Sequence, residues 1–211
     1  MKKSLAVLFG GCSSEYEVSL HSAAAVLRAV DTENYELAMV GITRMGQWLY
    51  YTGDIDAIEA DAWHKSPARV RAVLSPSRAD HGLWLMKEEG CELKTIDLCL
   101  PVLHGKNGED GTVQGLLELA GIPVVGCGSL ASALCMDKDI AHRLALQVGI
   151  DCPRFTTVFA GQPMEAAARP VRQALGDPPL PWIVRPARGG PRVGGVRQEA
   201  AAPPARTPGT A

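Results

Sequence analysis

Residues 96–120 read IDLCLPVLHGKNGEDGTVQGLLELA, and the pattern of this stretch indicates the fold class most clearly. Residues 96–103 form a nearly continuous apolar run, which is typical of a strand in the middle of a parallel sheet. A Gly-rich loop follows at residues 104–111, and residues 112–120 are predicted to form a helix. This order predicts a strand–loop–helix unit whose loop lies at the carboxyl end of the strand, where open α/β sheets bind their ligands.

The rest of the chain alternates in a similar way. Residues 5–9 predict a buried strand ended by Gly10 and Gly11, and residues 18–30 have mostly helical spacing. Further strands are predicted at residues 37–42, 47–51 (an edge strand), 70–74, 83–86, 123–125, 152–159 and 182–184, and further helices at residues 55–62, 129–135, 138–148 and 163–175. The alternation predicts an α/β fold with a doubly wound parallel sheet.

Composition excludes several functional classes. The 211 residues carry a formal net charge of -2 and no long run of Lys or Arg, so nucleic acid is not an expected partner. No segment approaches the roughly 20 apolar residues of a membrane span, and the apolar stretch at residues 5–9 is shorter than the roughly 7–15 residues of a signal peptide. The six cysteines include no CxxC pair. We therefore expect reduced thiols and a cytoplasmic location, with no membrane partner.

The first candidate site is the loop after the first strand. Residues 10–19 read GGCSSEYEVS, which is not the GxGxxG pattern of dinucleotide folds. Ser14 and Glu17 match a helix capping box, with Glu15 favoured by the helix dipole. The alternative is that Glu15 faces the crevice and receives a substrate ammonium. Both interpretations remain open from these residues.

The second candidate site is HGKNGEDGT at residues 104–112. Its three glycines let the backbone approach a ligand, and amides at a helix N-terminus favour a carboxylate or a phosphate. The alternative is a polar turn with Thr112 as the N-cap of the helix. A cap does not require a histidine, and His104 opens this loop.

Three separated motifs resemble the D-alanine-D-alanine ligase family of the ATP-grasp superfamily. They are GGCSSEYEVSLHSA at residues 10–23, LPVLHGKNGEDGTVQGLLELAGIPVVGCG at residues 100–128 and ASALCMDKDIAHRL at residues 131–144. The EYE triplet and GITRMGQW at residues 41–48 are most similar to the branch that includes the D-alanine-D-serine ligases of vancomycin resistance. The resemblance covers about residues 2–188 and disfavours another ATP-grasp ligase.

The resemblance implies two domains and a reaction. Residues 1–128 would form a Rossmann-like substrate domain, and residues 129–188 an incomplete start of the ATP-grasp domain. Such ligases transfer the γ-phosphate of ATP to the carboxylate of D-alanine, and the amine of a second D-amino acid, D-alanine or D-serine, attacks the product. The dipeptide enters cell-wall (peptidoglycan) precursor synthesis, and the family is commonly homodimeric.

The resemblance also implies roles for four residues. Glu15 would bind the ammonium of the first D-alanine, and His104 would lie near its carboxylate. Lys138, in Met-Asp-Lys, would reach an ATP phosphate. Arg185 stands where the family usually has an ATP-binding lysine, and arginine keeps the charge while replacing a point donor with a planar fork.

The sequence departs from the family after Pro186. The family continues with a Gly and Ser-Ser-x-Gly, whereas residues 190–194 read GPRVG, and Pro191 removes a backbone donor from a phosphate loop. Residues 189–211 are rich in Ala, Pro, Gly and Arg, which predicts a disordered tail. We interpret this tail as a shifted reading frame. The Mg²⁺ ligands of the family would then be absent, and we expect no ligation by the chain alone. The alternative is a non-catalytic remnant that weakly binds an amino acid or a nucleotide, or is inert.

Overall fold

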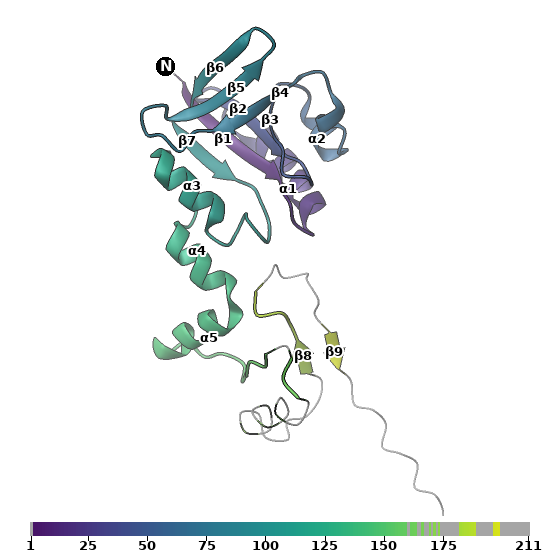
Figure 1. Ribbon diagram of the computed structural model, residues 1–211, viewed down its shortest axis with the longest axis vertical. Helices are drawn as coiled ribbons and strands as arrows, with labels where there is room; N and C mark the ends of the chain where they lie inside the picture. Colours follow the sequence, from purple (N-terminus) through teal and green to yellow (C-terminus); the bar gives the residue numbers. More distant parts are fainter. Residues whose placement is uncertain are drawn as a thin grey trace, which may run out of the picture.

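The computed structural model describes residues 2–159, 161–163, 166, 169, 171, 173, 182–188 and 196–198. Its larger part is a seven-stranded sheet in the order β6-β5-β4-β3-β2-β1-β7 (Figure 1). The strands are β1 (Lys3–Gly10), β2 (Tyr35–Ile42), β3 (Trp48–Tyr51), β4 (Arg69–Leu74), β5 (Gly82–Lys87), β6 (Gly90–Thr95) and β7 (Leu98–Pro101). The α/β class predicted from the sequence is confirmed.

The sheet is mixed rather than wholly parallel. Strand β1 pairs in parallel with β2 and β7, while β3 to β6 pair antiparallel with their neighbours. The turn between β2 and β3 contains Gly46 at a φ of 80°, and such a short connection can join only antiparallel strands. Among the described residues, the predicted parallel arrangement therefore holds for β1, β2 and β7, and the strand predicted at residues 123–125 is reduced to one parallel bridge between Val124 and Cys99. The predicted edge strand at residues 47–51 is wrong in position, because β3 lies inside the sheet, and β6 was not predicted.

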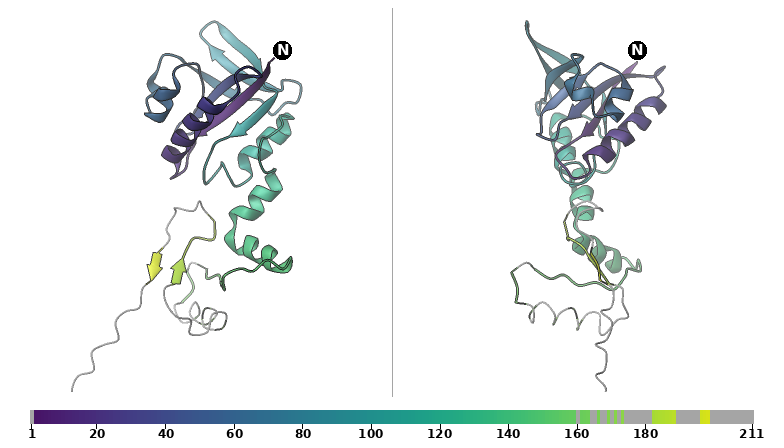
Figure 2. Two further views of the ribbon diagram at one scale, coloured as in Figure 1. Left: turned by 180° about the vertical axis from the view of Figure 1, so that it is seen from behind. Right: turned by 90° about the vertical axis from the view of Figure 1, so that its right-hand side faces the viewer.

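Helices cover both faces of the sheet (Figure 2). Helices α1 (Tyr16–Ala29) and α2 (Ile55–Glu59) and the 3-10 turn η1 (Trp63–Lys65) pack on one face, and α3 (Thr112–Ala120) on the other. The buried residues of α1 include Tyr16, Leu20, Ala23 and Leu27, a spacing that places them on one side of the helix. Alternate residues of β1 enter the two cores, so β1 is buried on both faces.

The remaining elements extend from one end of the sheet domain (Figure 1). They are α4 (Ser129–Met136), α5 (Lys138–Gln147), β8 (Trp182–Val184) and β9 (Val196–Gln198). Strands β8 and β9 pair antiparallel and form a separate two-stranded sheet. Both helices lie within a residue or so of their predicted bounds.

Three predictions for this region fare differently. No strand forms at residues 152–159, and the predicted helix at residues 163–175 falls largely outside the described residues. Disorder was predicted from residue 189 onward; residues 196–198 form β9, and the other residues of this range lie outside the described part. No helix in the described part of the chain is long and apolar enough to cross a membrane.

Candidate functional site

Two loops meet at the carboxyl ends of the adjacent strands β1 and β7. The Ser19 hydroxyl, which is fully buried, links them: its Oγ accepts a hydrogen bond from the Gly10 amide at 2.8 Å and donates to the Val102 carbonyl. The Val102 amide in turn donates to the Leu8 carbonyl at 2.8 Å. The strand pairing and one buried serine therefore hold the Gly10 loop beside the His104 loop.

Glu15 is buried in this junction, with 5% of its surface exposed. Its Oε2 atom has no hydrogen-bond partner among the described residues, and a Cβ placed on Gly105 would lie 3.0 Å from it. A carboxylate oxygen that is buried without a donor costs on the order of 1–3 kcal/mol. This position can be occupied favourably by a ligand that brings a cationic donor.

The capping-box interpretation of this loop is wrong. Glu15 itself is the N-cap residue of α1, and no side chain caps the helix. Ser14 is exposed, and Glu17 forms an ion pair with Arg44 at 2.7 Å instead. Ser13 is the residue that supports the turn, because its Oγ accepts a hydrogen bond from the Glu15 amide at 3.2 Å.

His104 is held at the edge of the same junction. Its Nε2 lies 3.3 Å from the Ser22 hydroxyl of α1, and its Nδ1 lies 3.8 Å from Glu109 Oε1. The other oxygen of Glu109 accepts a hydrogen bond from the Gly105 amide at 2.7 Å. The imidazole therefore bridges α1 and the Gly-rich loop, and the Gly105 turn joins this group to Glu15.

The start of α3 differs from its predicted form. The N-cap is Gly111, at a φ of 90°, and not Thr112. The Thr112 amide donates a hydrogen bond to Asp110 Oδ1 at 3.1 Å, and the other oxygen of Asp110 accepts from the Asn107 amide at 2.8 Å. Much of the loop's hydrogen-bonding capacity is thus used within the loop, and its ligand-facing groups are fewer than its composition indicates.

A cavity of about 330 Å³ opens beside the two loops. Its lining combines loop residues such as Gly11 and His104 with an apolar wall. That wall includes Ile42, Trp48, Leu103, Val113 and Leu116. Nothing in the sequence marked Ile42 and Trp48 as site residues, because Ile42 reaches the cavity through the parallel pairing of β2 with β1, and Trp48 through the antiparallel pairing of β3 with β2.

A second group of residues surrounds the start of α5. Burial, followed by the positive charge of Arg185, lowers the pKa of Lys138. The Lys138 amide donates to the Ala187 carbonyl at 2.9 Å, and Arg188 Nε donates to Asp137 Oδ2 at 2.8 Å. The cationic side chains of Lys138 and Arg185 lie near each other, and this arrangement suits an anionic ligand.

The structure brings the Gly105 turn beside Glu15, and Lys138 lies close enough to Arg185 for the positive charge of Arg185 to help lower its pKa. Within the described ranges, no group of three or more His, Cys, Asp or Glu side chains could hold a metal ion.

Comparisons with known proteins identify the family. The family described as "D-ala D-ala ligase N-terminus" matches residues 4–127. A D-alanine--D-alanine ligase of Caldicellulosiruptor bescii is 43% identical over 193 residues, which are 92% of this chain and 52% of that protein. The vancomycin B-type resistance protein VanB of Enterococcus faecalis is 40% identical, with the same two shares.

Among solved structures, the VanG D-Ala:D-Ser ligase from Enterococcus faecalis has a TM-score of 0.82 and 41% identity. The match covers 93% of this chain and 55% of that one. The chain spans about half the length of the relatives it matches. With more than half of its residues matched by the family, the chain belongs to the D-alanine-D-alanine ligase family.

Proposed function

We propose that this chain provides the first-substrate site, and part of the nucleotide site, of a cytoplasmic ATP-dependent ligase. The reaction would join D-alanine to a second D-amino acid through a carbon–nitrogen bond, for cell-wall precursor synthesis. The observation that carries the proposal is the buried Oε2 atom of Glu15, which has no partner among the described residues. An ammonium group is the complementary ligand.

The chain's own groups suit both ends of an amino acid. Glu15 would accept the ammonium, and His104 would lie near the carboxylate, fixed between Ser22 and Glu109. Holding the ammonium at Glu15 would fix the amino acid with its carboxylate on the His104 side. Glu15 and His104 would bind and orient the substrate. The apolar wall of the cavity, which includes Trp48, would limit the access of water to the bound substrate.

Lys138 and Arg185 fit the phosphates of ATP, because two neighbouring cations with a lowered lysine pKa are relieved by an added anion. When bound, ATP would supply the phosphoryl group that activates the D-alanine carboxylate. Mg²⁺ normally accompanies such a reaction, and the described residues include no group of three or more His, Cys, Asp or Glu side chains that could hold it.

We further propose a division into a substrate domain at residues 1–128 and the start of an ATP-grasp domain at residues 129–188, and a homodimer as in the family. The second amino acid is D-alanine or D-serine. The similarity to the VanG D-Ala:D-Ser ligase of Enterococcus faecalis, at 41% identity, supports D-serine.

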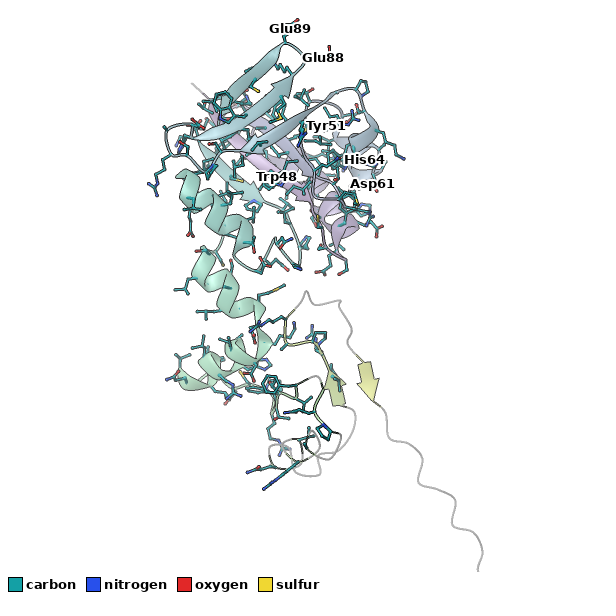
Figure 3. All side chains as sticks on the ribbon, viewed as in Figure 1. Trp48, Tyr51, Asp61, His64, Glu88 and Glu89 are labelled. Atoms are coloured by element: carbon teal, nitrogen blue, oxygen red, sulfur yellow. The ribbon has the colours of Figure 1, made fainter. Side chains whose placement is uncertain are left out.

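Calorimetric titration of D-alanine tests the first-substrate site. The chain should bind D-alanine saturably, and Glu15→Gln should weaken binding at least about tenfold, since a charge-assisted hydrogen bond is worth about 1.5–3 kcal/mol. Glu89→Gln is the matched control, because Glu89 is exposed at the far β5–β6 turn (Figure 3). Equal affinity of the Glu15→Gln variant and the unaltered chain would contradict the proposal.

Titration with ATP tests the second group separately. Lys138→Ala should weaken ATP binding about tenfold, as expected for loss of a charged phosphate contact of about 1.4 kcal/mol. Arg143→Ala, on the same helix, removes an ion pair with Asp139 and should leave ATP affinity unchanged. An inert remnant would show no heat with either ligand.

A further inference from the structure

Tyr16, the residue directly after Glu15, is anchored by the segment that contains Asp61 and Trp63. Its ring is 2% exposed, and its hydroxyl donates to Asp61 Oδ1 at 2.8 Å. The same hydroxyl accepts a hydrogen bond from Trp63 Nε1 at 3.3 Å. Burial, and next the hydrogen bond to Asp61, raises the pKa of the phenol, so it remains a neutral donor. Tyr16 therefore connects the Glu15 turn to residues far along the chain.

Arg44 closes the same group from the β2–β3 turn. Its guanidinium carbon lies 4.1 Å from the centre of the Tyr16 ring, a cation–π distance. It also pairs with Glu17 at 2.7 Å and reaches Asp61 at 4.0 Å. The turn that carries Arg44 also contains Gly46, which lines the cavity. Arg44 thus ties the cavity wall, the start of α1 and Asp61 together.

Asp61 is held in an uncommon backbone conformation. Its φ is 53°, in the left-handed region that residues other than glycine adopt infrequently. Trp63, two residues later, is fully buried and packs edge-on against Phe9 of β1, with 4.9 Å between ring centroids. Asp61 and His64, labelled in Figure 3, lie beside each other, and His64 Nδ1 is 3.3 Å from Asp61 Oδ1. A non-glycine residue such as Asp61 keeps a left-handed backbone conformation only where the contacts around it hold it there.

Glu15 itself has little to hold it. No side chain caps α1 at Glu15, and the Oε2 atom has no partner among the described residues. Its direction in the crevice is therefore set by the backbone on either side, which Ser13 supports before it and Tyr16 fixes after it. A carboxylate without its own hydrogen bonds needs such support to be pre-organised for a ligand.

We propose that Asp61 is a positioning residue of the first-substrate site: it holds Tyr16, and through Tyr16 it keeps the Glu15 carboxylate directed into the crevice for the substrate ammonium. The inference rests on the proposed function, because it names how that site is set. Arg44 supports the same arrangement from above the Tyr16 ring.

The chain offers a control that separates a specific role of Asp61 from the simple attachment of its segment, from α2 to Trp63, to α1. Arg28, near the other end of α1, pairs with Asp56 at 2.5 Å and Glu59 at 2.6 Å. These ion pairs join the same helix to the same segment without touching Tyr16. If the segment acts only as a structural cover, Arg28→Ala and Asp61→Ala should have similar effects on D-alanine binding.

The test combines calorimetric titration of D-alanine with hydrogen exchange of the backbone amides at residues 13–17. Asp61→Ala should weaken D-alanine binding about tenfold and speed exchange at these amides. Tyr16→Phe, which keeps the ring and removes the donor, should do the same to a lesser extent. Asp61→Asn retains an acceptor for the tyrosine hydroxyl and should restore affinity to within about threefold of the unaltered chain. Arg28→Ala should change neither quantity.

The outcomes separate the two proposals. If the unaltered chain binds D-alanine and Glu15→Gln does not, but Asp61→Ala binds as well as Arg28→Ala, the inference about Asp61 is overturned and the proposed function stands. If the unaltered chain does not bind D-alanine, both are overturned. Failure of Asp61→Asn to restore affinity also contradicts the inference, because the hydrogen bond to Tyr16 is then not what matters.

Discussion

The sheet domain and the α4–β9 region support their site residues in different ways. Among the described residues, the buried hydrophobic side chains extend from Leu5 to Ile122, and none belongs to α4 or α5. Helix α5 has no buried residue, and Leu146, Val148 and Ile183 are at least half exposed. Glu15 and His104 thus lie beside a packed core, while the start of α5 is held by hydrogen bonds that include the one from Arg188 to Asp137. One half of the proposed site is therefore pre-organised by the core, and the other is held by local contacts.

The largest expected effect is on stability. Phe9→Ala removes a fully buried ring that packs against Trp63 and should lower the free energy of unfolding by about 3–5 kcal/mol. Leu144→Ala, on the 42%-exposed side chain in α5, should lower it by less than about 1 kcal/mol. Urea unfolding followed by tryptophan fluorescence measures both. Similar losses for the two variants would remove the distinction between the regions.

The next effect concerns the junction of the two loops. Ser19→Ala leaves the Gly10 amide and the Val102 carbonyl without their buried partner and should cost about 1–3 kcal/mol. The same unfolding measurement detects it. Ser132→Ala, at a buried serine of α4, is the matched control and should cost less. If the order of the two variants is reversed, Ser19 does not link the loops as described.

A smaller effect is expected with pH at the start of α5. The hydrogen bond from Arg188, and next the Ile140 amide, lowers the pKa of Asp137. A depressed carboxyl pKa stabilises the folded form above the ordinary value of 3.8 and loses that contribution as pH falls through the lower folded value. Amide exchange at the first turn of α5 should therefore speed up below about pH 4.

Arg188→Ala should remove most of that pH dependence while leaving the amides of α1 unchanged. A pH response that persists in this variant would mean that Asp137 does not depend on Arg188.

The smallest effect is expected at the far hairpin. Lys87 and Glu92 form an exposed ion pair across β5 and β6, and exposed pairs of this kind contribute little. Lys87→Ala should leave the urea midpoint and D-alanine binding unchanged. A clear loss of D-alanine binding would show that the β5–β6 hairpin influences the crevice, and it would contradict the expectation that this hairpin plays no part in the site.

Local patterns predicted much of this fold. Helix α3 begins and ends where expected, since glycines at positions 111 and 121 adopt left-handed conformations at its two ends. Glu15 and His104 were proposed as site residues because their loops follow buried strands. The sequence-based prediction extended parallel pairing to too many strands. The apolar composition of β3 to β6 is compatible with either pairing direction, and only the short turns between these strands require antiparallel pairing.

The contacts that set the site were not predictable from one sequence. Asp61 is 45 residues from Tyr16, and Arg44 is 27 from Glu17. Each reads as an ordinary surface charge by composition, and nothing in its local pattern reveals a partner across the fold. The role of Ser19 was hidden for the same reason, because its acceptor at Val102 is 83 residues away.

A crystal structure of the chain with D-alanine tests the central claim most directly. We expect the ammonium nitrogen of bound D-alanine within about 2.7–3.2 Å of Glu15 Oε2, with its carboxylate on the His104 side of the crevice. D-alanine bound elsewhere, or bound with its ammonium turned away from Glu15, would contradict the claim that this buried carboxylate receives the substrate.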